Sequence, residues 1–291
     1  MSKKLEVSKN LPGPGVYAAI DFGISNIDAV ACIDGYLRHW TQPAGGRPGA
    51  ELAQSVLAAG RVDLASLQRL AVTGGRHRLL PGRIGDCAVV SVNEVQAIGR
   101  GGQALAEPAT QDSAPSILVV SAGSGTAVVA VESGECAHVT GAGVGGGTLL
   151  GLSRLLLHTV DPGEIDALAQ QGDPNGADLS LADVTNGPIG QLPADATAVN
   201  FGRLARRALA VCREDLAAAL VTLVGQVIGI VAINAAHARQ IERVVVTGHL
   251  IDMNSVRRVL EEVSNIYGLP IILPPEAGHA TALGALLHIA S

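Results

Sequence analysis

Two stretches of the chain repeat one pattern of apolar and polar positions. Residues 16–34 read VYAAIDFGISNIDAVACID, and residues 116–133 read SILVVSAGSGTAVVAVES. In both, an apolar run leads into a short polar turn with glycine and a second apolar run follows, which is the pattern of a β-hairpin. The repeat predicts two similar units, each opened by a hairpin. Aligning the turns pairs Gly23 with Gly123, Ser25 with Gly125, and Asn26 with Thr126.

The rest of the chain alternates predicted strands with predicted helices, which favours an α/β architecture. The segment LAVTGGRHR (70–78) reads as a strand and a turn, and VVVTGH (244–249) reads as a buried strand that Gly248 turns sharply. A helix is predicted to begin at Glu94, with Asn93 as its N-cap. Asp252 or Asn254 is expected to cap the helix that follows Gly248.

One uncharged stretch, residues 216–236, is long enough to span a bilayer. It contains three polar residues and much Ala and Gly, and Asp215 and Arg239 bound it closely. We therefore interpret it as the buried core helix of a soluble domain and not as a membrane span.

The two glycine turns suit the binding of phosphate groups. Backbone N–H groups in such turns point into one concavity and bind anions, and glycine lets the backbone approach a phosphate without a Cβ in the way. Asp21, at the first turn, can hold Mg²⁺ through water, and Ser25, Ser124 and Thr126 can add hydroxyl contacts. One glycine hairpin is usually an ordinary turn, but two at matched positions predict a cleft that holds a nucleoside triphosphate. The P-loop sequence GxxxxGK[ST] is absent.

A third glycine cluster, GAGVGGGTLLG (141–151), precedes a helical pattern. A glycine loop that opens a helix offers unpaired N–H groups to an anion. Gly145, Gly146 and Gly147 are therefore further candidates for ligand binding, with a flexible connector as the alternative.

Composition narrows the function classes. The chain has 291 residues, 48% of them hydrophobic and 16% charged, which is enough for two lobes around a large core. The formal net charge is −6 and no basic stripe exists, so nucleic acid is a poor candidate partner. Residues 1–10 carry lysines without an apolar segment after them, so no signal peptide is expected. No CxxC pair occurs, which favours a reduced cytoplasmic chain for the four cysteines, Cys32, Cys87, Cys136 and Cys212.

An ordered set of segments resembles the type II pantothenate kinases, a family within the superfamily of actin, sugar kinases and heat-shock ATPases. IDFGISNIDAV (20–30) resembles the first phosphate motif of that superfamily, and SAGSGTAV (121–128) resembles the second. The segments that follow the family's order and spacing are VTGG (72–75), NEVQAIG (93–99), HVTGAGVGGGTLLGL (138–152), LAQQGDPNGADLSLADV (168–184) and VVVTGHLIDMN (244–254). The similarity runs from about residue 16 to the C-terminus.

The resemblance implies a two-lobed actin-like ATPase (ribonuclease H-like) fold, with duplicated lobes, mixed sheets and a cleft between them. Residues 1–14 would be a flexible tail, 15–112 the N-terminal lobe, and 113–291 the C-terminal lobe with the dimerisation helices. It further implies ATP- and Mg²⁺-dependent phosphorylation of a primary hydroxyl, as on pantothenate in coenzyme A biosynthesis, by a cytoplasmic homodimer.

The resemblance also assigns roles to residues. Glu94 matches the family's catalytic base, although a carboxylate at a helix start is also favourable on dipole grounds alone. Asp21 would organise Mg²⁺, the Gly23 and Gly123 turns would hold the phosphates, and Gly248 would lie near the adenosine. The substrate-binding residues would be His138, Thr140 and Gly141.

Two positions depart from the family pattern. His138 stands where the family usually has an Arg that helps hold the substrate, and a neutral imidazole cannot replace a permanently charged fork. Asp28 stands where the first phosphate motif often carries Lys, and it adds negative charge. The sequence therefore leaves open a kinase of a different small alcohol and a non-catalytic nucleotide or acyl-CoA sensor, and for His138 a strand-end position with no ligand role. An ATPase that activates a redox enzyme through an iron–sulfur cluster ranks last, because the cysteines are not clustered.

Overall fold

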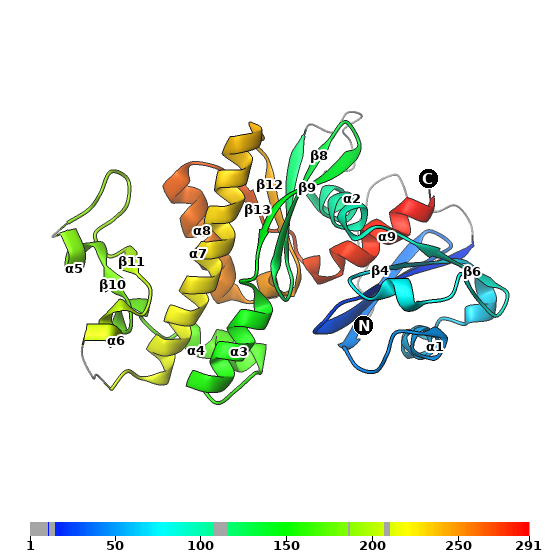
Figure 1. Ribbon diagram of the computed structural model, residues 1–291, viewed down its shortest axis with the longest axis horizontal. Helices are drawn as coiled ribbons and strands as arrows, with labels where there is room; N and C mark the ends of the chain where they lie inside the picture. The colour runs from blue at the N-terminus through cyan, green and yellow to red at the C-terminus, as the bar shows by residue number, and fades with distance from the viewer. Residues whose placement is uncertain (1–10, 12–14, 107–115, 186, 207–209, 291) are drawn as a thin grey trace.

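The structure is a computed structural model that describes residues 11, 15–106, 116–185, 187–206 and 210–290. Almost all of the tail predicted at residues 1–14 lies outside the described residues. Two mixed β-sheets lie side by side along the molecule, and helices pack between and around them (Figure 1).

The first sheet has six strands in the order β3-β2-β1-β4-β6-β5. The strands are β1 (Val16–Phe22), β2 (Asn26–Ile33), β3 (Tyr36–Pro43), β4 (Leu67–Thr73), β5 (Arg83–Ile84) and β6 (Cys87–Ser91). The first three form an antiparallel meander, and β4 and β6 continue the sheet in parallel with β1. Strand β2 is buried on both faces, because α1 (Ala50–Ala59) covers one side and α9 (Ala280–Ala290) covers the other.

The second sheet has five strands in the order β13-β12-β7-β8-β9. They are β7 (Ile117–Ala122), β8 (Thr126–Glu132), β9 (Glu135–Ala142), β12 (Val244–Thr247) and β13 (Ile271–Ile272). One face packs on α7 (Arg213–Arg239) and α8 (Asn254–Tyr267), and the other packs on α2 (Glu94–Ala106). The large apolar residues of the second sheet are therefore buried between these helices.

The two sheets repeat one topology, as the sequence predicted. Each begins with an antiparallel three-stranded meander and adds two parallel strands beside its first strand. The second hairpin of each meander turns at matching dipeptides, Asp34-Gly35 (φ 49° and 82°) and Ser133-Gly134 (φ 53° and 82°). Positive φ at both central residues is the geometry of a type I′ turn, which matches the twist of the flanking strands.

Two helices cross between the halves. Helix α2 follows the first sheet in sequence, yet Ile98 packs among strands of the second sheet, and α9 follows the second sheet, yet Leu283 and Leu286 pack on the first. Where α2 and α9 cross, a Cβ built on Gly101 would lie 1.8 Å from the Ala280 carbonyl oxygen, so only glycine permits this approach. The predicted lobe boundary at residues 112/113 stays a prediction.

Helix α7 is the apolar stretch recognised in the sequence. By length and composition it could cross a membrane, but 61% of its most apolar 18-residue window is buried inside the protein. This agrees with the predicted core helix. Its outer face is also apolar: Leu223 and Val227 are half-buried and Ile230 is 38% exposed.

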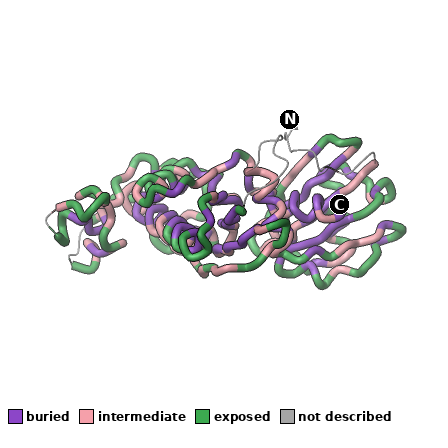
Figure 2. The backbone as a smooth tube through the Cα atoms, turned by 90° about the horizontal axis from the view of Figure 1, so that it is seen from above, coloured by how far each residue is buried: buried purple, intermediate pink, exposed green. Residues whose placement is uncertain are grey.

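A small module projects at one end, between α4 (Pro162–Ala169) and α7 (Figures 1 and 2). It contains β10 (Leu179–Ser180), α5 (Leu181–Thr185), β11 (Thr197–Val199) and α6 (Gly202–Arg206). The buried carboxylate of Asp178 joins its parts, because it accepts hydrogen bonds from the Phe201 N–H (2.7 Å) and the Thr197 hydroxyl (3.1 Å).

The start of α8 differs from the prediction. Neither Asp252 nor Asn254 caps it with a side chain. Instead Asp166 of α4 accepts hydrogen bonds from the N–H groups of Asn254 (3.2 Å) and Ser255 (2.8 Å). The cap is therefore a tertiary contact, which fixes α4 against the start of α8.

Candidate functional site

A cavity of about 460 Å³ lies between the two halves. Both predicted glycine turns line it: Gly23 to Asn26 from the first half and Gly123 to Thr126 from the second. The Ser25 and Ser124 hydroxyls meet across it at 2.8 Å. The two turns therefore face one another over a single space, as the sequence predicted.

The second turn is held from behind by α3 (Gly146–Leu156). The N–H groups of Gly146 and Gly147 donate to the carbonyls of Gly123 (2.8 Å) and Ser124 (2.9 Å). The expectation that these N–H groups stay unpaired for an anion is wrong. Glycine is needed here for close packing, since a Cβ on Gly145 would lie 2.8 Å from the Gly125 Cα. The loop makes the second turn rigid.

Thr126 has a similar bracing role. Its hydroxyl donates to the Val144 carbonyl at 2.7 Å, and the residue is 6% exposed. Its proton is therefore already used within the protein, whereas the Ser25 and Ser124 hydroxyls bond, within the described part of the chain, only to one another across the cavity.

A pair of glycines in positive φ closes the back of the site. Gly74 (φ 90°) follows β4, and a Cβ on it would lie 2.7 Å from the Phe22 carbonyl oxygen and 2.3 Å from an Asp21 carboxylate oxygen. Gly248 (φ 102°) follows β12, and its Cβ would lie 2.3 Å from the Ala122 carbonyl oxygen. Each glycine lets a turn approach the end of the strand that leads into a phosphate turn.

Two carboxyl groups are placed to do chemistry. Asp21 ends its strand on the cavity, and Glu94 opens α2, where Asn93 caps the helix by accepting from the Val95 N–H at 2.9 Å. Burial raises the pKa of Asp21 to about 8, with the charges of Asp28 and Glu94 adding to the rise and His249 opposing it. A cation bound beside Asp21 would relieve this repulsion.

The donor set bears on how Mg²⁺ would be held. Among the described residues, no group of three or more His, Cys, Asp or Glu side chains is arranged to hold a metal ion. Mg²⁺ usually keeps several waters and takes one or two carboxylates together with substrate phosphates. Asp21 beside two phosphate turns fits that mode, so the ion would arrive with the nucleotide.

The other end of the cavity is apolar. Leu149 and Leu150 of α3, Pro162 of α4, and Leu250 and Met253 beside Gly248 line it. A flat aromatic base is the kind of group that such walls accommodate. Nothing in the sequence distinguishes these residues from core residues, because an apolar helix face has the same pattern in both cases.

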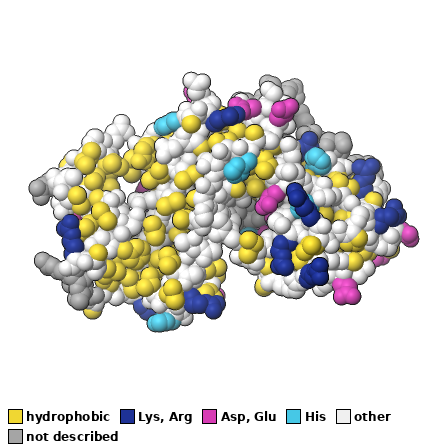
Figure 3. Space-filling model, viewed as in Figure 1, with side chains coloured by type: hydrophobic (Ala, Val, Ile, Leu, Met, Phe, Trp, Pro, Cys, Tyr) yellow, Lys and Arg dark blue, Asp and Glu magenta, His cyan; other side chains and the backbone are white. Residues whose placement is uncertain are grey.

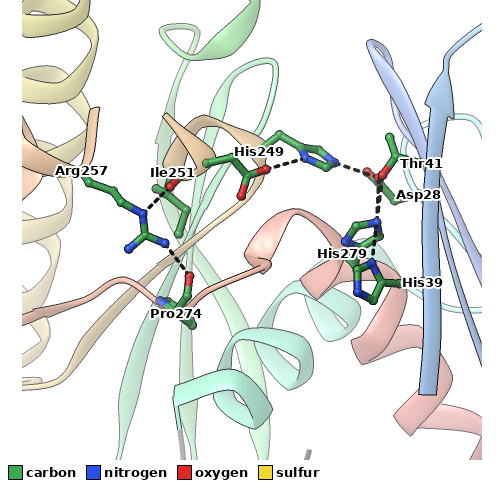
Figure 4. A network of polar contacts seen from close by, with 9 residues as sticks. Asp28, His39, Thr41, His249, Ile251, Arg257, Pro274 and His279 are labelled. Atoms are coloured by element: carbon green, nitrogen blue, oxygen red, sulfur yellow. Dashed lines mark hydrogen bonds and ion pairs between the residues drawn. The ribbon is translucent and has the colours of Figure 1, made fainter. Parts of the chain in front are cut away.

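A polar network ties the halves together beside the cavity (Figure 4). Asp28 of β2 accepts from Thr41 of β3 at 2.6 Å and bonds His249 Nε2, from the second half, at 2.8 Å. His249 Nδ1 bonds Asp252 at 3.0 Å. Burial works to lower the pKa of His249, but hydrogen bonds to Asp252 and Asp28 and their charges outweigh it and raise the pKa to about 10.. His249 is therefore an imidazolium between two carboxylates.

The same network continues through a second histidine. His279 Nε2 lies 2.9 Å from the Thr41 hydroxyl oxygen and 3.4 Å from His39 Nδ1, and His39 Nε2 lies 3.2 Å from Glu276. Burial and the nearby charge of His39 lower the pKa of His279 to about 4. His279 is thus neutral where His249 is charged.

The structure places most of the predicted site residues on the cavity. Those that line it are Asp21, Gly23, Ser25, Asn26, Glu94, Gly123, Ser124, Gly125, Thr126, Gly146 and Gly248. Gly145 and Gly147 stand behind the second turn. His138, Thr140 and Gly141 are not among the lining residues, because they lie on β9, at the edge of the sheet beyond β8, and only Ala142 reaches the cavity. Their role in substrate binding stays a prediction.

Comparisons with known proteins identify relatives of this chain. The family model named Fumble matches residues 92–287. A type II pantothenate kinase of Bacillus cereus strain G9842 is 25% identical over 224 residues, covering 76% of this chain and 82% of the relative. One of Oceanobacillus iheyensis is 29% identical over 217 residues, covering 74% and 80%.

Solved structures with the same fold include proteins of other functions. The activator of the 2-hydroxyisocaproyl-CoA dehydratase of Clostridium difficile, with bound ADPNP, has a TM-score of 0.64 and 14% identity, with 94% of each chain covered. A ROK family glucokinase of Streptomyces griseus with glucose and AMPPNP has a TM-score of 0.56 and 13% identity, with 94% and 98% covered. The fold is the predicted actin-like ATPase fold. The match over residues 92–287 places the chain in the Fumble family, the family of the type II pantothenate kinases.

Proposed function

We propose that this protein is an ATP-dependent kinase that phosphorylates the primary hydroxyl of pantothenate or a related small alcohol, within coenzyme A biosynthesis. The observation that carries the proposal is the meeting of two glycine turns over one cavity that also holds Asp21 and Glu94. Relatives named type II pantothenate kinase, at 25% and 29% identity, support the same reaction class.

The nucleotide would lie across the cavity with its base at the apolar end. Leu149, Leu250 and Met253 offer walls for adenine, and the Gly23 and Gly123 turns offer backbone N–H groups to the phosphates. The Ser25 and Ser124 hydroxyls, now bonded to each other, would part and donate to phosphate oxygens. A cavity of about 460 Å³ lies in the usual size range for ligand sites.

In the proposed reaction Glu94 orients the acceptor hydroxyl and takes its proton as the γ-phosphate transfers. Asp21 would hold Mg²⁺ through water, and the ion when bound neutralises charge on the phosphates. The positive φ of Gly74 keeps the backbone of the next turn close to Asp21, which fixes that carboxylate at the end of its strand. Most of the rate would come from positioning and charge neutralisation.

The proposal extends to assembly and location. Hydrophobic side chains gather on the face that carries α7 (Figure 3). In α7 itself, Leu223 and Val227 are half-buried and Ile230 is exposed. An apolar helix face of this kind is the type that a second copy buries in a homodimer. We place the protein in the cytoplasm as a dimer, which sedimentation velocity would report as twice the chain mass.

A non-catalytic nucleotide sensor is the second candidate. It is favoured by the Asp28–His249 bond, which joins the two halves beside the cavity. It is disfavoured by Asp21 and Glu94, since a protein that only binds nucleotide needs neither a metal carboxylate nor a base. An iron–sulfur activator is disfavoured because Cys32 and Cys87 are buried in separate clusters.

The test is ADP release, coupled to NADH oxidation, with pantothenate, pantetheine and other primary alcohols as acceptors. Glu94→Gln should lower kcat about 10²- to 10⁴-fold, because general base catalysis is lost while nucleotide contacts remain. Its affinity for Mg-AMPPNP, measured by calorimetry, should stay within about threefold of the wild type. Turnover of Glu94→Gln near the wild-type rate would contradict the assignment of the base, and Mg-AMPPNP binding with no acceptor phosphorylated would favour the sensor.

A further inference from the structure

The ionisable side chains that line the cavity are nearly all acids. Asp21, Asp28 and Glu94 line it with carboxyl groups. Among the described residues that line it, no Lys or Arg occurs, and His249 is the one side chain that carries positive charge. A ligand with a carboxylate would therefore meet acids along the walls and no arginine or lysine.

His249 is not available as a positive partner for a ligand carboxylate. Its Nε2 is held by Asp28 at 2.8 Å and its Nδ1 by Asp252 at 3.0 Å. Both N–H groups of the imidazolium are used, and its charge is shared between two carboxylates. A ligand carboxylate could bind His249 only by displacing the carboxylate of Asp28 or Asp252.

The other lining groups that can donate to an anion are uncharged: the backbone N–H groups of the two turns, the Ser25 and Ser124 hydroxyls, and the side chains of Asn26, Ser121 and Thr281. Under the proposed function the turns and their two serine hydroxyls hold the phosphates, which leaves a second anion only neutral donors. The nearest arginines in sequence, Arg76 and Arg78, follow Gly75, but both are exposed and neither lines the cavity.

We infer that the acceptor of this kinase carries no negative charge, and that it is a neutral or amine-bearing primary alcohol. This inference rests on the proposed function. A carboxylate that loses water in the cavity would go without a charged partner, which is costly. A hydroxyl, amide or ammonium group can replace its lost water contacts there, because carboxylates accept hydrogen bonds from each of them. Asp28 is the residue that determines this specificity, since it adds a negative charge to the lining of the cavity.

The experiment compares two acceptors that differ only in this charge: pantothenate, and panthenol, in which a hydroxymethyl group replaces the carboxylate. The wild-type protein should show a kcat/KM for panthenol at least about tenfold above that for pantothenate. Calorimetry of both compounds with Mg-AMPPNP bound should show the same order of affinity. Because calorimetry needs no turnover, it reads the preference separately from catalysis.

Two variants sharpen the result. Asp28→Asn keeps the side-chain shape and removes the charge, so the ratio should fall about threefold to tenfold. Arg76→Ala should leave the ratio unchanged.

Equal or better use of pantothenate by the wild type would overturn the inference and leave the kinase standing. It would also be overturned if Arg76→Ala lost pantothenate activity alone, since the exposed arginine would then hold the carboxylate. Phosphorylation of no alcohol would overturn the proposed function, and calorimetric preference for pantothenate would then overturn the inference independently.

Discussion

The two halves of the molecule share a backbone and differ in chemistry. Both have a meander, a glycine turn after the first strand, and a positive-φ glycine, Gly74 or Gly248, after the neighbouring parallel strand. At equivalent places, however, the first half has Asp21 where the second has Ser121. The turn that suits phosphate binding is therefore present twice, whereas the acidic side chain is present only in the first half.

The turns also differ in rigidity. The second is held by the N–H groups of Gly146 and Gly147, while the first exposes Ile24 at its tip by 78%. The first turn is tied to the chain by the Ala44 N–H, which donates to the Ser25 carbonyl at 2.9 Å. The half that carries the acid therefore has the less supported turn.

The largest expected effect separates the two equivalent positions. Asp21→Asn should lower kcat about 10²- to 10³-fold, because a charge that holds the metal is lost. The matched control is Ser121→Ala, which should lower kcat less than about threefold. Steady-state ADP release at saturating ATP measures both, and similar losses in the two variants would show that the halves share the chemistry equally.

The next effect tests the shared backbone. Gly74→Ala and Gly248→Ala should each lower the free energy of unfolding by about 2–4 kcal/mol, from positive φ together with contact to a strand carbonyl. Gly134→Ala is the control, since its φ is 82° but nothing lies within 4 Å of the added Cβ, so the loss should be about 1 kcal/mol. Urea unfolding measures all three variants. A mild effect at only one of Gly74 and Gly248 would show that the two glycines do not have equivalent roles in the two halves.

The smallest effect concerns the link between the halves. The pKa of His249 is about 10 in the folded protein, compared with 6.5 for an unperturbed histidine. The charged side chain therefore stabilises the fold fully below pH 6.5, and this stabilisation is lost as the pH rises through 10. The side chain is 32% exposed, so screening limits the loss to about 1–2 kcal/mol. His249→Gln should show no such decline in urea unfolding between pH 6.5 and 10.

His279 provides the opposite slope as a control. Its pKa is lowered to about 4, so the folded state binds fewer protons than the unfolded chain and stability falls as the pH drops from 6.5 towards 4. His279→Gln should reduce this acid-side loss and leave the alkaline side unchanged. An alkaline loss that persisted in His249→Gln would assign it to another group.

Local patterns predicted a large share of this molecule. The hairpins, the cap at Asn93 and the start of α2 at Glu94 follow from alternation, glycine and capping residues close together in sequence. The common cavity followed from one more step, the recognition that two such turns are equivalent. These features depend on short-range rules that a single sequence carries.

The rest depends on contacts between distant residues. His249 meets Asp28 across 221 positions and His279 meets Thr41 across 238, and no periodicity relates them. The N–H groups of Gly146 and Gly147 were expected to be unpaired because the carbonyls that accept from them belong to another turn. The cap of α8 from Asp166 was missed for the same reason.

The crossing of α2 and α9 has a consequence for how this protein is made and how it moves. Each half lends a helix to the other, so a fragment cut near residue 112 would leave the second sheet without the cover of Ile98 and the first without that of Leu283. Neither piece carries a complete core, so we expect neither to fold by itself. Because Gly101 and Gly284 bring the two backbones into contact, we expect that crossing to stay fixed in any movement of one half against the other.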